Sequence, residues 1–82
     1  MFYVYILRSL KDGRIYIGYT SDLRLRFKQH CEGKVESTLH RRPLELVYYE
    51  AYRNKEKARE RERKLKDFGS SYKGLMKRIG IK

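Results

Sequence analysis

The sequence has one cysteine, one proline and no tryptophan, and its acidic residues are scarce beside its basic ones. Because Cys31 is alone, an intrachain disulfide and a cysteine-based metal cluster are both excluded. No apolar run approaches the roughly 20 residues that a membrane-spanning helix requires. Residues 2–7 are apolar, but no basic segment precedes them and no cleavage site follows, which argues against a signal peptide. We therefore expect a cytoplasmic protein that does not associate with membranes.

Basic charge dominates the composition. The 82 residues include 21 Lys and Arg against 10 Asp and Glu, which gives a formal net charge of +11. A hydrophobic content of 40% is sufficient for a folded core, and a chain of this length forms one domain, residues 1–82. On so small a surface this charge creates a positive field that attracts polyanions. Composition therefore favours a nucleic-acid partner, although a basic structural protein of a ribonucleoprotein has the same composition.

The N-terminal part of the chain is typical of a β-hairpin followed by a helix. Residues 2–9 are rich in aromatic and β-branched side chains, which favours a strand, and residues 15–19 repeat that composition. An Asp-Gly pair between them is a strong signal for a tight hairpin turn. Thr20, Ser21 and Asp22 are N-cap candidates, so we expect a helix over about residues 22–31.

The remainder of the chain predicts one more strand and two more helices. Residues 34–43 are polar and basic, as in an exposed loop, whereas residues 44–52 have the composition of a strand. Asn54 is a suitable N-cap for a helix that extends to Lys66. A Gly-Ser-Ser break then precedes a short helix that ends near residue 79. The order ββαβαα predicts an α+β fold, with a small, three-stranded, mainly antiparallel sheet flanked by helices.

Alternation along the two hairpin strands separates two kinds of face. With the turn centred on the Asp-Gly pair, Ser9 lies opposite Tyr16 and Tyr5 lies opposite Thr20. One face is then purely apolar, with Phe2, Val4, Ile6, Ile15 and Ile17. The other carries tyrosine hydroxyls around a glycine, with Tyr3, Tyr5, Leu7, Tyr16, Gly18 and Thr20. Any one tyrosine here fits an ordinary strand position with a solvated hydroxyl. Tyr5 and Tyr16 together with Gly18 indicate a functional surface.

The first predicted helix places two basic side chains beside its buried stripe. Leu23 and Phe27 form that stripe, at i and i+4. Arg26 and His30 lie next to it and one turn apart, so both project toward the junction of helix and sheet. A single histidine at a helix edge is usually structural. The pairing with an arginine one turn away favours a phosphate-binding site instead.

Glu62 lies on the side of the second predicted helix that must pack inward. Ala58, Glu62 and Leu65 are at i, i+4 and i+7, so the carboxylate is in the middle of an apolar stripe. An unpaired buried carboxylate is costly, so a cation or hydrogen-bond donors must meet it. Two interpretations are equally supported by spacing. One is a structural salt bridge to Arg26 or Arg61, and the other is a divalent metal ion.

The spacing of these residues resembles that of the GIY-YIG nuclease superfamily. The segments Tyr3-Val4-Tyr5 and Tyr16-Ile17-Gly18 resemble its paired signature, with a tyrosine in place of the first glycine. Arg26 and His30 follow in register, as do the Arg-Arg-Pro before the third strand and the Ala-Arg-Glu-Arg-Glu segment that ends at Glu62. The likeness covers essentially the whole chain. Within the superfamily the chain resembles the short stand-alone members, which lack the added DNA-binding domains of homing endonucleases and excision-repair subunits.

This resemblance implies hydrolysis of phosphodiester bonds with the help of one Mg²⁺ or Mn²⁺. Glu62 would ligate the ion, which polarises the scissile phosphate and stabilises the departing 3′ oxygen. Tyr16 would act as the general base or position it, and nearby positive charge must then favour its phenolate, because an ordinary tyrosine has a pKa of about 10. Arg26 would neutralise the phosphate in the transition state. His30 and Tyr5 would orient water and phosphate or relay the proton.

Further contacts to nucleic acid are expected around this centre. Gly18 would leave room for close approach of the phosphate backbone. The outer surface of the first helix and the basic loop would supply side chains that contact nucleic acid, namely Arg24, Lys28, His40, Arg41 and Arg42.

Two functions are compatible with the sequence. The first is a metal-dependent endonuclease of the repair or recombination type, with DNA favoured over RNA as the substrate. The alternative is a non-catalytic nucleic-acid-binding module with a degenerate nuclease site. In either case a protein partner or a second copy of the chain would supply contacts that one small domain lacks.

Overall fold

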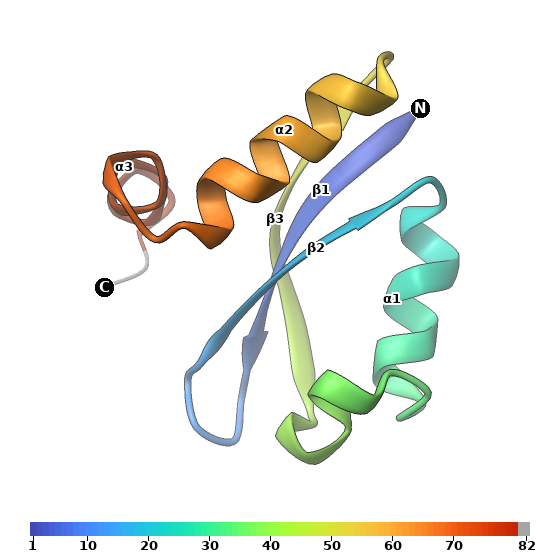
Figure 1. The fold of residues 1–82 in the computed structure, drawn as a ribbon. Coiled ribbons are helices and arrows are strands. Elements are labelled where there is room, and N and C mark those ends of the chain that lie inside the picture. The colour runs from blue at the N-terminus through green and yellow to red at the C-terminus, as the bar shows by residue number, and fades with distance from the viewer. Residues whose placement is uncertain (81–82) are drawn as a thin grey trace.

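The sheet at the centre of the structure has three strands in the order β2-β1-β3, and both pairings are antiparallel. A computed structural model describes residues 1–80 (Figure 1). Its elements are β1 (Phe2–Ser9), β2 (Ile15–Thr20), α1 (Leu23–Cys31), the 3₁₀ helix η1 (Glu36–Arg41), β3 (Leu44–Tyr52), α2 (Lys55–Lys66) and α3 (Ser70–Arg78). The predicted α+β fold and the order ββαβαα are confirmed.

The hairpin confirms the predicted faces but not the predicted register. Tyr16 lies opposite Leu7 and not opposite Ser9, and Tyr5 lies opposite Gly18 and not opposite Thr20. The reason is a wider turn, in which the Ser9 amide donates to the Arg14 carbonyl over 2.9 Å. Because the shift is two residues and side chains alternate with a period of two, each residue keeps its predicted face.

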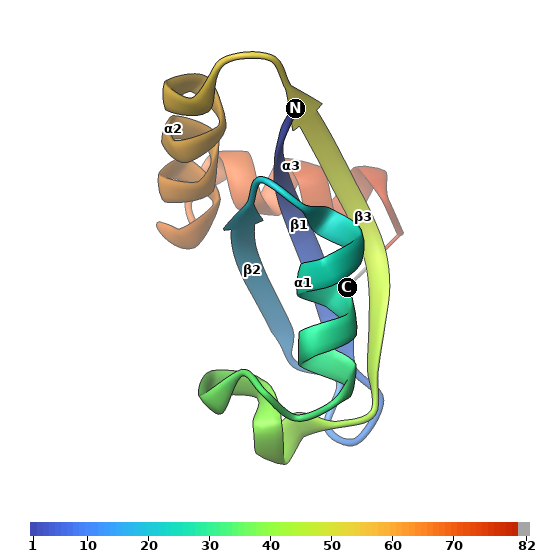
Figure 2. The ribbon, with the colours of Figure 1, turned by 90° about the vertical axis from the view of Figure 1, so that its right-hand side faces the viewer.

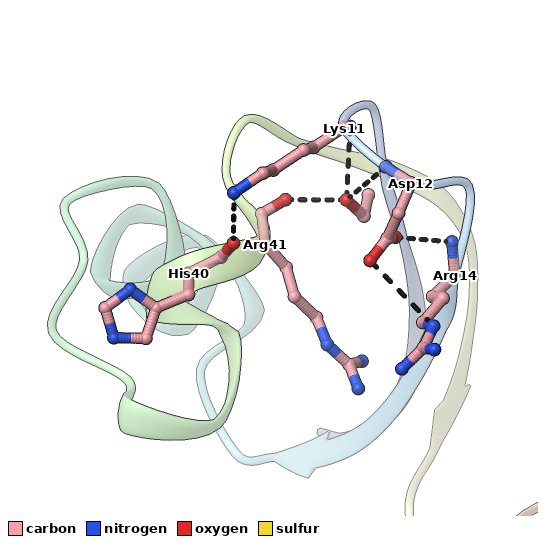
Figure 3. A network of polar contacts seen from close by, with 6 residues as sticks. Lys11, Asp12, Arg14, His40 and Arg41 are labelled. Carbon is pink, nitrogen blue, oxygen red and sulfur yellow. Dashed lines mark hydrogen bonds and ion pairs between the residues drawn. The ribbon is translucent and has the colours of Figure 1, made fainter.

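The wide turn is held by its own polar groups. The Ser9 hydroxyl oxygen accepts hydrogen bonds from the amides of Lys11 and Asp12, each over 3.2 Å. The Asp12 carboxylate accepts from the Arg14 amide over 2.9 Å, as Figure 3 shows. Gly13 adopts a φ of 75°, which an L side chain rarely tolerates. These bonds stabilise a longer loop than the two-residue turn that the Asp-Gly pair predicted.

Helices cover both faces of the sheet. In Figures 1 and 2, α1 lies over one face, while α2 and α3 lie on the opposite side. The α2 and α3 side holds the larger core, built from Val4, Ile6, Ile17, Ala58, Leu65, Leu75 and Met76. The α1 side holds a smaller one, in which Tyr5, Leu7 and Leu44 pack against Tyr16, Leu23, Phe27 and Leu46. The part of the tyrosine face that lies under α1 is therefore a second core and not an open surface. Within residues 1–80 no helix is long and apolar enough to cross a membrane.

The two predicted N-caps are present. The Asp22 carboxylate accepts from the Leu25 amide at the start of α1, and the Asn54 side chain accepts from the Lys57 amide at the start of α2, each over 3.1 Å. Both helices therefore begin within one residue of the predicted position. Gly33 follows the end of α1 with a φ of 77°, which is typical of a glycine that ends a helix.

The segment predicted as an exposed loop is more ordered than expected. Residues 36–41 form η1, and within it Thr38 is fully buried. Two backbone carbonyls of η1 are fixed by the hairpin turn. The Ser9 hydroxyl donates to the Arg41 carbonyl over 2.7 Å, and the Lys11 ammonium donates to the His40 carbonyl over 3.3 Å (Figure 3). The loop is polar, as predicted. Its contacts with the hairpin turn join residues far apart in the chain, so the local sequence does not predict them.

One polar network fixes α2 against β3. The Glu50 carboxylate accepts two hydrogen bonds from the Arg61 guanidinium, each 3.0 Å long. The hydroxyls of Tyr48 and Tyr52 donate to the same carboxylate over 2.6 and 2.5 Å. These donors lower the pKa of Glu50 against the effect of burial, and burial together with the carboxylate raises the pKa of Tyr52 to about 12. The bidentate contact between Arg61 and Glu50 sets the rotation of α2 about its axis, and so determines which residues of α2 face the sheet.

Removing the Glu50 carboxylate should destabilise the fold strongly. In Glu50→Ala, the half-buried Arg61 would lose both acceptors, and we expect the free energy of unfolding to fall by about 2 kcal/mol. Glu60→Ala is the matched control, because Glu60 forms an exposed pair with Lys64 and its loss should cost about 0.5 kcal/mol or less. Urea denaturation followed by circular dichroism measures both. Equal stability of the two variants would contradict an anchoring role for Glu50.

Candidate active site

Three aromatic rings from separate elements meet beneath α1. Tyr5 comes from the central strand, Tyr16 from the edge strand β2 and His30 from the last turn of α1. The His30 ring contacts both tyrosines edge-on, with centroid distances of 5.6 Å to Tyr5 and 5.1 Å to Tyr16. The two tyrosine rings are 6.3 Å apart. The structure therefore brings together three of the predicted site residues.

A chain of hydrogen bonds passes through His30. Its Nε2 lies 2.8 Å from the Tyr5 hydroxyl, and its Nδ1 lies 2.7 Å from the Thr38 hydroxyl. The Thr38 hydroxyl also lies 3.4 Å from the Val35 carbonyl, to which it can donate. In the tautomer that carries its proton on Nδ1, the imidazole donates to Thr38. Nε2 is then the acceptor for the Tyr5 hydroxyl. Thr38 is a site residue that the sequence did not reveal, because η1 reaches α1 only in the folded chain.

Burial determines the protonation of these groups. Desolvation, assisted by the charge of Arg26, lowers the pKa of His30 from 6.5 to about 4, so the imidazole is neutral at pH 7. Desolvation also raises the pKa of Tyr5 from 10.0 to about 12, with a further contribution from Tyr16. Tyr5 is only 1% exposed and His30 is fully buried. Tyr5 is therefore a neutral phenol, and neither group meets bulk water directly.

Gly18 makes room for the Tyr5 ring. A Cβ atom at position 18 would lie 2.3 Å from Cζ of Tyr5 and 2.4 Å from its hydroxyl oxygen. The reason predicted for this glycine, room for the phosphate backbone, is therefore replaced by an intramolecular one. Only glycine lets the ring of β1 cross the backbone of β2 and reach α1.

Arg26 and Glu62 complete the cluster electrostatically. The charge of Arg26 lowers the pKa of Tyr5, and the charge of Glu62 raises it, so both lie within electrostatic reach of this phenol. Arg26 is half-buried, and its guanidinium donates to the Gln29 side chain over 3.2 Å. Tyr5, Tyr16 and His30 thus meet beneath α1, while Arg26 and Glu62 act on Tyr5 through their charge.

The ion pairs of Glu62 differ from those predicted. Its carboxylate lies 2.9 Å from the Lys66 ammonium and 3.8 Å from Nε of Arg59, and 14% of the side chain is exposed. Neither predicted partner is used, because Arg61 points toward β3 and binds Glu50, while Arg26 lies on α1. The partners found are helical neighbours at i+4 and i−3. Their side chains are about half exposed, at 50% for Lys66 and 53% for Arg59, so both can move away without disturbing the core.

Glu62 is the carboxylate that could hold a metal ion in this region. Within residues 1–80, no group of three or more His, Cys, Asp or Glu side chains is arranged to hold one. Mg²⁺ is nevertheless often bound through one or two carboxylates, with water and substrate phosphate as the remaining ligands. A single carboxylate with replaceable cationic partners fits this type of site, and it does not fit a closed structural site.

The residues predicted to contact nucleic acid lie outside the cluster. Arg24 and Lys28 are exposed on α1, His40 and Arg42 are exposed at the end of η1, and Arg41 is half-buried. In the described part of the chain none of these five forms an ion pair. The guanidinium of Arg42 donates to the Leu39 carbonyl over 3.1 Å. Their contact with nucleic acid stays a prediction.

Comparison with known families agrees with this arrangement. The sequence model of the family described as "GIY-YIG catalytic domain" matches residues 1–76. The chain belongs to this family.

Individual relatives make the resemblance more specific. The chain is 39% identical to a UPF0213 protein of Bacillus pumilus over 74 residues, which cover 89% of this chain and 74% of the relative. It is 42% identical to a UPF0213 protein of Staphylococcus epidermidis over 67 residues, or 80% of each protein. The solution structure of a UPF0213 protein from Bacillus halodurans matches with a TM-score of 0.58 at 38% identity. That match covers 96% of this chain and 85% of the other.

A methyl group at position 18 should disturb the site. In Gly18→Ala, the overlap with Tyr5 would force the ring away from His30, and we expect a loss of about 2 kcal/mol in the free energy of unfolding. Gly74→Ala is the control, because an added Cβ in the middle of α3 meets nothing within 4 Å beyond its chain neighbours and the helix's own backbone. That substitution should stabilise by about 0.5–1 kcal/mol. Chemical denaturation measures both, and a Gly18→Ala variant as stable as wild type would contradict the packing described.

Stability should fall in mild acid because of His30. Its pKa is lower in the folded chain, about 4, than the ordinary 6.5, so the folded state binds fewer protons than the unfolded state between these values. The contribution of neutral His30 to the free energy of unfolding is complete above pH 6.5 and is lost as pH falls toward 4. We expect the melting temperature of wild type to fall over this pH range. In His30→Gln the part of that fall that His30 causes should be absent.

The second histidine provides the control for this pH profile. His40 is exposed, so His40→Gln should retain the wild-type decline. The comparison is of slopes and not of absolute melting temperatures, because His30→Gln also loses buried contacts. A His30→Gln profile parallel to wild type between pH 6.5 and 4 would refute the assignment of a neutral buried imidazole.

Proposed function

We propose that this chain is a divalent-metal-dependent endonuclease that hydrolyses nucleic-acid phosphodiester bonds, with DNA favoured over RNA. The observation that supports the proposal is the contact of Tyr5, Tyr16 and His30 beneath α1, with Arg26 and Glu62 within electrostatic reach of Tyr5. Membership of the GIY-YIG catalytic-domain family supports an endonuclease type of chemistry. The net charge of +11 favours binding of the polyanionic substrate.

Arg26 and Tyr16 are the groups that would meet the substrate. The Arg26 guanidinium, held by Gln29, would neutralise charge on the scissile phosphate as it becomes pentacovalent. Tyr16 is half-buried and is the more accessible phenol of the pair, so its hydroxyl would position the attacking water. One Mg²⁺ or Mn²⁺ held by Glu62 would supply Lewis-acid stabilisation of the negative charge on the phosphate and the departing 3′ oxygen.

Tyr5 and His30 would support the groups that meet the substrate without contacting it themselves. The raised pKa of Tyr5, about 12, makes its phenolate unavailable near neutral pH, so it is not the general base. Its hydroxyl donates to His30, and its ring packs 6.3 Å from that of Tyr16. The pair would therefore fix the orientation of Tyr16, and it would offer a neutral imidazole that can accept a proton passed through the Tyr5 hydroxyl.

One feature favours the alternative, a non-catalytic nucleic-acid-binding module. Lys66 and Arg59 already neutralise the Glu62 carboxylate, and a metal ion must compete with both. If the ion cannot displace them, the same surface would still bind phosphate through its arginines. The two functions therefore differ in metal binding at Glu62.

Cleavage and metal binding should both depend on Glu62. We expect wild type to cut branched, single-stranded or supercoiled DNA with Mg²⁺ or Mn²⁺, and Arg26→Ala to slow cleavage by about 10²–10³-fold. Glu62→Ala should abolish cleavage and the binding of Mn²⁺, which electron paramagnetic resonance follows without any substrate. Glu60→Ala, on the same helix and paired with Lys64, is the control and should keep both properties.

Two results would contradict the nuclease. If wild type leaves every substrate intact in both metals, the binding module replaces it. If Glu62→Ala cuts as fast as wild type, the carboxylate is not part of the centre.

A further inference from the structure

A groove lies beside α1, on the flank away from β2. We call it the aromatic groove, and its walls include Tyr3, Arg24, Phe27, Leu46 and Tyr49. Figure 2 shows β3 running alongside α1 on this side. The groove has a volume of about 570 Å³, within the range of about 300–1,000 Å³ that is usual for pockets that hold a small organic ligand.

The groove exists because α1 covers only part of the sheet face. Tyr5 lies under the helix and is 1% exposed, whereas Tyr49, directly opposite it on β3, is 53% exposed. The Tyr3 ring supports Tyr49 edge-on, with centroids 6.1 Å apart and planes inclined by 64°. This contact braces Tyr49 from one side.

Arg24 lines the aromatic groove, and the positive charge of the helix that carries it favours an anionic ligand. Residues 23–31 of α1 contain Arg24, Arg26 and Lys28 and no acidic residue. Within residues 1–80 none of these three side chains is paired with a carboxylate. Asp22 also lines the groove, but its carboxylate is occupied as the N-cap of α1, where it accepts from the Leu25 amide.

The aromatic groove and the candidate active site lie on opposite flanks of α1. Arg24 and Arg26 are two residues apart, which separates them by about 200° around the helix axis. Arg26 belongs to the cluster with Tyr5, whereas Arg24 lines the groove. Phe27 belongs to both, because it packs against the core cluster that includes Tyr5 and also forms a wall of the groove. A nucleic acid at the active site could therefore place an adjoining strand in the groove by passing over α1.

We propose that the aromatic groove binds unpaired bases of a single-stranded segment of nucleic acid. Tyr49 would stack on a base, and Arg24 would contact an adjacent phosphate. Single-strand sites combine cations with aromatic side chains in this way, because every base presents a π-face once it leaves the duplex. Bases within a duplex are already stacked, so a duplex gains little from Tyr49. The inference rests on the proposed function, and it makes branched or flapped nucleic acid the substrate class.

The test is a binding measurement in EDTA, so that no cleavage can occur. Fluorescence anisotropy is recorded with labelled oligothymidylate, with oligouridylate, and with the duplex of oligothymidylate and oligoadenylate. We expect Tyr49→Ala to weaken single-strand binding by about tenfold and to leave duplex binding unchanged. Tyr49→Phe keeps the ring and should bind as wild type. Arg24→Ala should weaken binding and reduce the salt slope on single strands by about 0.7.

Phe68→Ala is the matched control, because Phe68 is also 53% exposed but lies beyond α2 and contacts Tyr72. It should bind single strands as wild type does, and circular dichroism confirms that each variant is folded. Equal binding of single strands by wild type and Tyr49→Ala would overturn the proposal, as would an equal loss in Phe68→Ala or no single-strand binding by wild type.

The two proposals fail separately. A Tyr49-dependent affinity without metal-dependent cleavage would retain the groove and reject the nuclease. Glu62-dependent cleavage with a Tyr49→Ala variant that binds single strands normally would retain the nuclease and reject the groove. Preference for oligouridylate over oligothymidylate would identify RNA as the source of the strand, and the reverse would identify DNA.

Discussion

The passage of the Tyr5 ring across Gly18 sets the geometry of the candidate site. Because position 18 has no side chain, the ring can lie over the neighbouring strand and bring its hydroxyl within 2.8 Å of His30. His30 in turn contacts Thr38, so one phenol links β1, β2, α1 and η1. A larger residue at position 18 would separate these elements, and the position of Arg26 on α1 would change with them.

The carboxylates of Glu50 and Glu62 serve different purposes. Glu50 is held by Arg61 of α2 and by two tyrosine hydroxyls of its own strand, so its partners are fixed by the fold. Glu62 is held by helical neighbours with half-exposed side chains, so its partners can be replaced. The first carboxylate therefore orients α2, and this orientation presents the second to the region around Tyr5.

Helix α1 carries the positive charge that connects the two proposals. Its inward residues pack on the core cluster that includes Tyr5, and its two arginines lie on opposite flanks, Arg26 near Tyr5 and Arg24 at the aromatic groove. A phosphate backbone that crosses this helix would meet cations on both sides without meeting an acidic residue of the helix. Electrostatics of this kind favours association with any nucleic acid, whereas the shape of each flank selects what binds there.

The sequence by itself determined the elements, the faces of the strands and the helix starts, because a period of two and an N-cap residue are local properties. It also identified the residues of the candidate site through their types and spacing. The tertiary structure decided the hairpin register, the burial of Thr38, and the partners of Glu50 and Glu62. These depend on the width of one turn and the rotation of α2. The rotation of α2 is set by the Arg61–Glu50 contact between two elements, and the width of the turn is set by hydrogen bonds that the Asp-Gly pair does not predict.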